Sequence, residues 1–155
     1  MKQVIILRGL SGSGKSTVAE TIRQSVKHTC LVLSADDYLT VNGVYSWSVE
    51  KMRDAHDYCF RTFATTVMAG EINMIVVDNV NREIRDYSKY MIMAELCGYE
   101  VVLLEIACVD GQTMEFFHAR SKHNIPISTA QNMWAKWETD PRAKLLTVTK
   151  TVTQN

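Results

Sequence analysis

The sequence predicts a three-layer α/β/α fold around a mainly parallel sheet of about five strands. Short apolar runs alternate along the chain with segments of helical periodicity, and the runs at residues 74–77 and 101–106 are apolar at almost every position. Alternation of this kind is typical of strand–helix crossover units, and continuous apolar strands are typical of sheets covered on both faces. At 155 residues the chain is expected to form a single domain, residues 1–155.

The expected strands are the apolar runs. They cover residues 4–7, 30–33, 74–77 and 101–106, and a last run at residues 145–152 alternates with Thr and Lys. Alternation of apolar and polar side chains indicates a strand with one exposed face, so the last run is predicted to be an edge strand.

The expected helices lie between these runs. Apolar residues recur at helical spacing over residues 15–26, 49–68 and 84–96, and Gly70 and Gly98 are placed to end the second and third. Asp110 is expected to cap a fourth helix that runs through Phe117. The stretch from Ser128 to Gln131 has the form of a capping box, which predicts a fifth helix that carries Met133, Trp134 and Trp137.

Composition limits the possible partners. The 17 basic and 17 acidic residues give a formal net charge of zero, so a nucleic-acid partner needs a local basic cluster. No apolar run approaches the ~18 residues of a membrane span, and we expect a cytoplasmic protein with no membrane partner. The four cysteines form no Cys-x-x-Cys pair, which favours reduced thiols over a zinc site.

The stretch GLSGSGKS, from Gly9 to Ser16, fits the pattern G-x-x-x-x-G-K-[ST] and stands between a predicted strand and a predicted helix. Glycines allow a tight turn whose N–H groups point at phosphate oxygens, and the following helix adds its positive end. Lys15 is placed to reach the β- and γ-phosphates, and Ser16 to ligate Mg²⁺. The predicted cofactors are ATP, or another nucleoside triphosphate, and Mg²⁺. The residues expected to bind the nucleotide are Gly9, Gly12, Ser13, Gly14, Lys15, Ser16 and Thr17.

Carboxylates follow two other predicted strands. Asp36 and Asp37 come just after the second strand, and one of them is placed to accept a proton from a hydroxyl acceptor. Asp78 ends the third strand, where a magnesium partner of the Walker-B type is required. Arg82 and Arg85 follow it and are either acceptor contacts in the same crevice or solvated surface charges.

The densest cationic segment is HARSKHNIP, residues 118–126. A cationic segment that closes over phosphates stabilises the charge of a phosphoryl group in transfer. The region at about 111–137 is therefore expected to be a helical lid.

These stretches together resemble one family. GLSGSGKST, SADDY, NGVYSWSVEKMRDAHDYCFRTF, VVDNVN and ARSKHNIP are similar, in order and spacing, to blocks of the P-loop kinase family that includes the phage polynucleotide kinase module and its stand-alone relatives. The resemblance extends roughly to Glu138 and implies a P-loop NTPase fold. It also implies ATP-dependent phosphorylation of a 5′-hydroxyl end of a polynucleotide.

The resemblance also assigns roles to individual residues. It makes Asp36 the general base, Arg120 the lid residue on the ATP phosphates, and Asp78 a residue that organises Mg²⁺ or the acceptor. His123 and Pro126 are in register with the lid pattern. His56 matches a position that is either structural or on the acceptor side.

Two alternatives remain open at this stage. Leu39 stands where the phage enzyme has an acceptor-contacting arginine, and Arg82 or Arg85 are candidates to replace it. Leu39 and the zero net charge favour a small-molecule kinase that acts on a nucleoside, nucleotide or metabolite. A third reading is an ATP-binding regulatory module without kinase activity. The sequence leaves the oligomeric state open.

Overall fold

The computed structural model describes residues 1–148. The strands of the main sheet are β1 (Gln3–Arg8), β2 (Cys30–Leu33), β5 (Met74–Asp78), β6 (Glu100–Ile106) and β7 (Lys144–Leu146). The helices are α1 (Lys15–Ser25), α2 (Ala35–Leu39), α3 (Val49–Ala69), α4 (Ile84–Leu96), α5 (Gly111–Arg120) and α6 (Ile127–Ala135). A small hairpin consists of β3 (Thr40–Val41) and β4 (Val44–Tyr45).

The main sheet has the strand order β2-β5-β1-β6-β7, and every pairing in it is parallel. This confirms the predicted α/β fold. Parallel neighbours need crossover connections, and the helices between the strands supply them. β1 lies at the centre with Leu7 opposite Asp78 in register, so the chain that leaves β1 emerges beside the end of β5.

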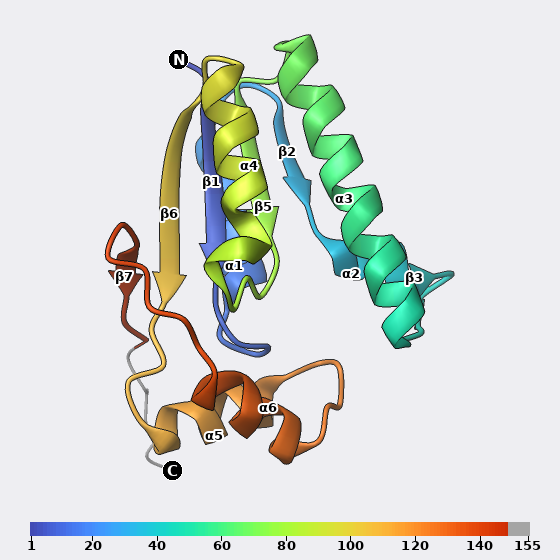
Figure 1. Cartoon of the computed structure of the whole chain (residues 1–155), viewed down its shortest axis with the longest axis vertical. Coiled ribbons are helices and arrows are strands. Elements are labelled where there is room, and N and C mark those ends of the chain that lie inside the picture. Colours follow the sequence, from blue (N-terminus) through green and yellow to red (C-terminus); the bar gives the residue numbers. More distant parts are fainter. Residues whose placement is uncertain (149–155) are drawn as a thin grey trace.

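Side chains of β1 alternate between the two faces of the sheet. Val4 and Ile6 pack with α3 and α4 in a core that includes Phe63, while Ile5 and Leu7 pack against α1. Figure 1 shows α4 on one side of the sheet and α1 on the other. Because both faces are covered, the central strands carry almost only apolar residues.

Helices α5 and α6 lie beyond the carboxyl ends of the strands, as Figure 1 shows. Their own core includes Met114 and Phe117, with Trp134 and Trp137 packed against it. The indole N–H of Trp134 donates to the Cys108 carbonyl. The two tryptophans therefore pack against the core that α5 and α6 share.

Most predicted helix ends agree with the structure. Asp110 caps α5 by accepting from the Thr113 N–H, and Gly70 ends α3 at φ 68°. The predicted capping box at Ser128 is wrong, because α6 already begins at Ile127 after Pro126. Proline fixes its own φ, and the Pro126 carbonyl accepts from the Thr129 and Ala130 N–H groups.

The last predicted strand is confirmed in part. β7 pairs in parallel with β6 at the sheet edge but covers only Lys144–Leu146, and the predicted residues 149–152 lie outside the described part. Within residues 1–148, no helix is both long and apolar enough to cross a bilayer, and no cluster of metal-ligating side chains is found. Among the described residues, the four cysteines form no disulfide.

Candidate active site

The turn between β1 and α1 forms a glycine-lined cradle. Gly12 and Gly14 have φ of 79° and 104°, a region that side chains rarely adopt. A Cβ at Gly9 would lie 2.6 Å from Ser13 Oγ. That hydroxyl is buried and has no hydrogen-bond partner among the described residues. Since a buried polar atom without a partner is costly, the cradle fits an oxygen-rich ligand.

Helix α1 begins at Lys15 without a side-chain cap, so the N–H groups of its first turn are free to face the cradle. Ser16 Oγ donates to Asp78 Oδ2 at 3.2 Å, which brings the two predicted metal ligands together. Lys15 Nζ donates to the Leu10 carbonyl at 3.3 Å. Thr17 is exposed in the same first turn.

Burial shifts two pKa values at this point. It lowers the pKa of Lys15, an effect that the charges of Asp78 and Asp36 partly oppose. It raises the pKa of Asp78, which the charge of Lys15 partly opposes. Opposite shifts of neighbouring groups in a cleft are typical of sites that bind charged ligands.

Asp36 lies on α2, which faces the cradle from the end of β2. Ser34 caps this helix by accepting from the Asp36 N–H, and Asn79 Oδ1 accepts from the Ala35 N–H at 2.9 Å. These bonds fix α2 to the end of β5. The Asp36 carboxylate contacts the loop after α5, where Oδ2 lies 3.3 Å from His123 Nε2, and its charge acts on both Lys15 and Asp78.

The lid lies directly on the cradle. A Cβ at Gly12 would lie only 1.9 Å from the Phe117 carbonyl oxygen of α5. Ser11 and Ser121 share a hydrogen bond of 2.6 Å between their hydroxyl oxygens. Arg120 Nη2 lies 3.7 Å from the position of a Cβ on Gly14, and its guanidinium also stacks on Phe116. The structure thus places Arg120 beside the predicted phosphate site.

The three predicted acceptor contacts differ in their surroundings. Arg82 and Arg85 both form ion pairs with Glu83, and Arg85 is 82% exposed. His56 is half-buried on α3, and burial lowers its pKa while the charges of Asp86 and Asp36 act in the opposite direction. The charge of Asp36 therefore acts on His56. Leu39 is buried between α2 and α3, where it packs with Ala55.

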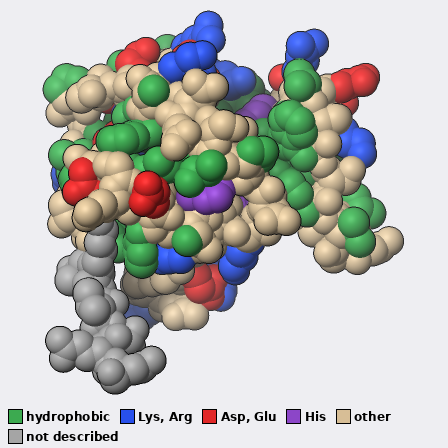
Figure 2. Space-filling view, turned by 90° about the horizontal axis from the view of Figure 1, so that it is seen from below, with side chains coloured by type: hydrophobic (Ala, Val, Ile, Leu, Met, Phe, Trp, Pro, Cys, Tyr) green, Lys and Arg blue, Asp and Glu red, His purple; other side chains and the backbone are tan. Residues whose placement is uncertain are grey.

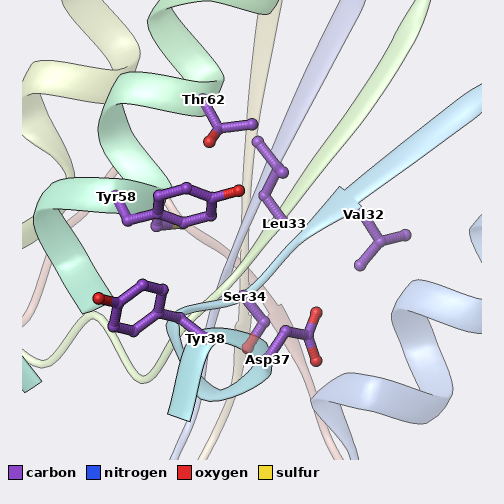
Figure 3. Close-up of a pocket in the computed structure, with 8 residues that line it drawn as sticks. Val32, Leu33, Ser34, Asp37, Tyr38, Tyr58 and Thr62 are labelled. Atoms are coloured by element: carbon purple, nitrogen blue, oxygen red, sulfur yellow. The ribbon is translucent and has the colours of Figure 1, made fainter. Parts of the chain in front are cut away.

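A cavity of about 440 Å³ opens beside α2, between β2 and α3. Asp37 and Tyr38 of α2 line it together with Tyr58 of α3, as Figure 3 shows. The two tyrosine rings lie 5.2 Å apart and are about half exposed. Asp37, next to Asp36 in sequence, therefore lines a hollow beside the edge strand β2, and its charge also acts on Asp78.

Arg8 is a buried residue that the sequence analysis passed over. It pairs with Glu105 at 2.7 Å and donates to three carbonyl oxygens, those of Asn81, Arg82 and Glu138. These bonds join β1 to the loop after Asp78 and to the segment after α6. The sequence did carry a signal for Arg8, because this charged residue directly follows an apolar strand. A charge buried at the end of such a strand requires hydrogen-bond or ion-pair partners, and this points to a structural role.

The face of the molecule at the carboxyl ends of the strands has mixed character. Figure 2 views it from the lid side and shows a histidine surface surrounded mainly by apolar and uncharged groups. Lysine and arginine side chains stand separately toward its margins.

Several known proteins are similar to this chain in sequence. Residues 4–139 match the family model described as an AAA domain. NEDD4-binding protein 2 of Homo sapiens is 31% identical over 102 residues, which are 66% of this chain and 6% of that protein. The 2′,3′-cyclic-nucleotide 3′-phosphodiesterase of Rattus norvegicus is 35% identical over 108 residues, 67% of this chain and 24% of that protein. The chain thus spans less than a quarter of either relative.

Solved structures show the same fold at low identity. A gluconokinase from Sinorhizobium meliloti 1021 superposes with a TM-score of 0.67 at 17% identity, over 96% of this chain and 84% of that one. Chaetomium thermophilum Kti12 in complex with ADP-AlF3 gives 0.62 at 16% identity, over 93% and 88%. Mycobacterium tuberculosis APS kinase CysC with AMPPNP and APS gives 0.59 at 14%, over 97% and 90%. The fold is that of the α/β P-loop NTPases.

Proposed function

This chain belongs to the AAA domain family, and on that premise we propose that it is an ATP-dependent phosphotransferase acting on a hydroxyl group. One observation carries the proposal: the segment that places Arg120 Nη2 beside Gly14 of the cradle also brings His123 Nε2 to 3.3 Å from Asp36 Oδ2 on α2. A bare nucleotide-binding domain needs the cradle alone. A carboxylate opposite the phosphate site is what transfer to an alcohol requires.

The residues present fit the triphosphate of ATP. The unpartnered Ser13 hydroxyl and the open first turn of α1 supply donors for phosphate oxygens, and Lys15 adds a positive charge. Ser16 and Asp78 would hold Mg²⁺, which neutralises phosphate charge when bound. Burial makes the charged forms of Lys15 and Asp78 costly in free energy, and the phosphates and Mg²⁺ would offset this cost by interacting with those charges.

Transfer then proceeds as an in-line displacement. The acceptor oxygen forms a bond to the γ-phosphorus as the bond to the leaving oxygen of ADP breaks, and the acceptor proton passes to Asp36. Lys15 and Arg120 stabilise the negative charge on the transferred group. The lid excludes water, which would otherwise compete as the acceptor.

We take a 5′-hydroxyl end of a polynucleotide as the preferred acceptor. The support is the order of five sequence blocks that resemble those of the polynucleotide kinase module, together with one relative whose name describes action on cyclic nucleotides. His56, half-buried near Asp36, is the acceptor-side residue that fits this role best.

A small hydroxyl acceptor is the second candidate, and two observations favour it. Leu39 is 3% exposed and belongs to the α2–α3 core, so it makes no contact with an acceptor phosphate. Arg82 and Arg85, the candidates to replace an arginine there, are both paired with Glu83.

Labelled ATP separates these candidates. Purified protein with Mg²⁺ is incubated with 5′-hydroxyl RNA and DNA oligonucleotides, with the same oligonucleotides already 5′-phosphorylated, and with mononucleosides and sugars. We expect label only on the 5′-hydroxyl oligonucleotides and none with Asp36→Asn. Label on small acceptors alone would establish the second candidate. ATP binding without label on any acceptor would favour a regulatory module.

A further inference from the structure

The loop after α5 reaches past the phosphate cradle to the opposite wall of the site. Ser121 bonds to Ser11 of the cradle through the two hydroxyl groups, and Ser121 Oγ also accepts from the His123 N–H at 3.5 Å. Asn124 has φ 54°, and this tight turn sends the chain back toward α6. The His123 side chain is therefore held out at the tip of the loop.

His123 meets two residues from the other side of the site. Its Nε2 lies 3.3 Å from Asp36 Oδ2, and its ring stacks on Tyr45 with centroids 4.2 Å apart and 31° between the planes. Tyr45 ends the β3–β4 hairpin and packs on the α2–α3 core. Burial raises the pKa of Tyr45, and the charge of Asp36 and a hydrogen bond with it add to the rise.

The contact leaves Asp36 open to an acceptor. The Asp36 side chain is still 46% exposed and that of His123 29% exposed, so the pair is not sealed. The imidazole contacts Oδ2, and the Tyr45 side chain also bonds to the carboxylate, so these two groups together set how Asp36 is presented to an incoming hydroxyl. A general base works only when its free oxygen points at the proton it removes.

We propose that His123 is a positioning residue for Asp36: its Nε2–H holds Oδ2 and so fixes the orientation of the carboxylate toward the acceptor, while Tyr45 holds the imidazole ring in place. Arg120 and His123 stand three positions apart on one segment. The packing of α5 on the cradle thus positions both the phosphate-binding cation and the residue that orients the base. This inference rests on the proposed phosphotransfer.

The test replaces the imidazole in two ways. His123→Leu keeps the volume and the backbone N–H but removes the side-chain donor, and His123→Gln returns an N–H donor to a similar position. We expect His123→Leu to lower kcat at least tenfold and to leave KM for ATP within about twofold of wild type, since the loss lies in orienting the base. His123→Gln should recover most of kcat.

His118→Leu is the matched control in the same lid. His118 Nε2 contacts the Ile125 carbonyl at 2.7 Å and touches neither Asp36 nor Tyr45. His118→Leu should loosen the lid without affecting the Asp36–His123 contact, and we therefore expect it to raise KM for ATP. A His123→Leu variant with normal kcat, a His123→Gln variant as impaired as His123→Leu, or a kinetic profile equal to that of the control would each overturn the inference.

A second measurement needs no turnover. Imidazole ¹⁵N chemical shifts of the wild-type protein should show a hydrogen-bonded Nε2–H on His123 that changes in Asp36→Asn, and unchanged shifts would overturn the contact. Wild-type protein that transfers label to no acceptor would instead refute the proposed function. The two failures are therefore distinguishable.

Discussion

Replacing Gly12 with alanine tests the contact between the cradle and the lid. Two costs arise at this position. The residue has φ of 79°, and the new Cβ would lie 1.9 Å from the Phe117 carbonyl oxygen and 2.9 Å from the Ser121 N. An ordinary contact begins at 3.4 Å, so the end of α5 must move away by about 1.5 Å. Arg120 and His123 move with it.

The two costs have different consequences. Adopting a positive φ costs an alanine about 1–2 kcal/mol of folding free energy wherever it occurs. A displacement of the lid by more than 1 Å misplaces catalytic groups and costs roughly 100-fold in kcat. Gly98→Ala separates the two, because Gly98 has φ of 82° but no described atom within 4 Å of the added Cβ.

Two assays on both variants complete the experiment. Denaturant unfolding should show the cost of a positive φ, about 1–2 kcal/mol, for Gly98→Ala and at least that loss for Gly12→Ala. Phosphoryl transfer, normalised to folded protein, should fall only in Gly12→Ala. Equal activity of the two variants would show that the lid does not rest on the cradle, and the reasoning would be refuted.

Three further substitutions probe other parts of the site. Arg120→Ala should lower kcat by roughly 100-fold in the transfer assay with little change in stability, and a normal kcat would contradict its place beside the phosphates. Arg8→Met should destabilise the fold by about 3–5 kcal/mol in denaturant unfolding, because Glu105, whose side chain is only 12% exposed, would lose its partner; a loss under 1 kcal/mol would refute this. Asp78→Asn should raise Tm of the ligand-free protein at neutral pH. Because burial raises the pKa of Asp78, its carboxyl makes the fold most stable when protonated, and stability is lost as pH rises through the folded pKa. The advantage of Asp78→Asn in Tm should therefore narrow as the pH is lowered toward 3.8, the ordinary value, and a gap that stays constant with pH would contradict the argument.

The fold could be read from the sequence because its central strands are buried on both faces. Residues 74–77 and 101–106 are apolar throughout, and the helices between the strands show clear periodicity. The cradle was equally visible, since a phosphate-binding turn demands glycines and Lys15 at fixed spacing. These features depend on local sequence alone.

Shorter elements escaped prediction for physical reasons. α2 has five residues, too few to show a helical period. The β3–β4 hairpin did carry a signal, because Asn42 and Gly43 both adopt positive φ, as a two-residue turn between antiparallel strands requires. That signal was overlooked, and with it the position of Tyr45.

Contacts made by the lid lay beyond sequence reasoning. His123 matched a family position, but its contact with Asp36 depends on how α5 packs on Gly12. Likewise, the pairing of Arg82 and Arg85 with Glu83 depends on side-chain geometry that no spacing encodes. The sequence thus supplied the candidate residues, and the structure supplied their partners.

Single-turnover transfer from γ-labelled ATP to a 5′-hydroxyl oligonucleotide tests the central claim most directly. Wild type and Asp36→Asn are compared with ATP bound to the same extent, as measured by calorimetry. We predict equal ATP affinity and transfer by the wild type only, with a loss of at least roughly 100-fold in the variant. Transfer by Asp36→Asn at the wild-type rate would contradict the account.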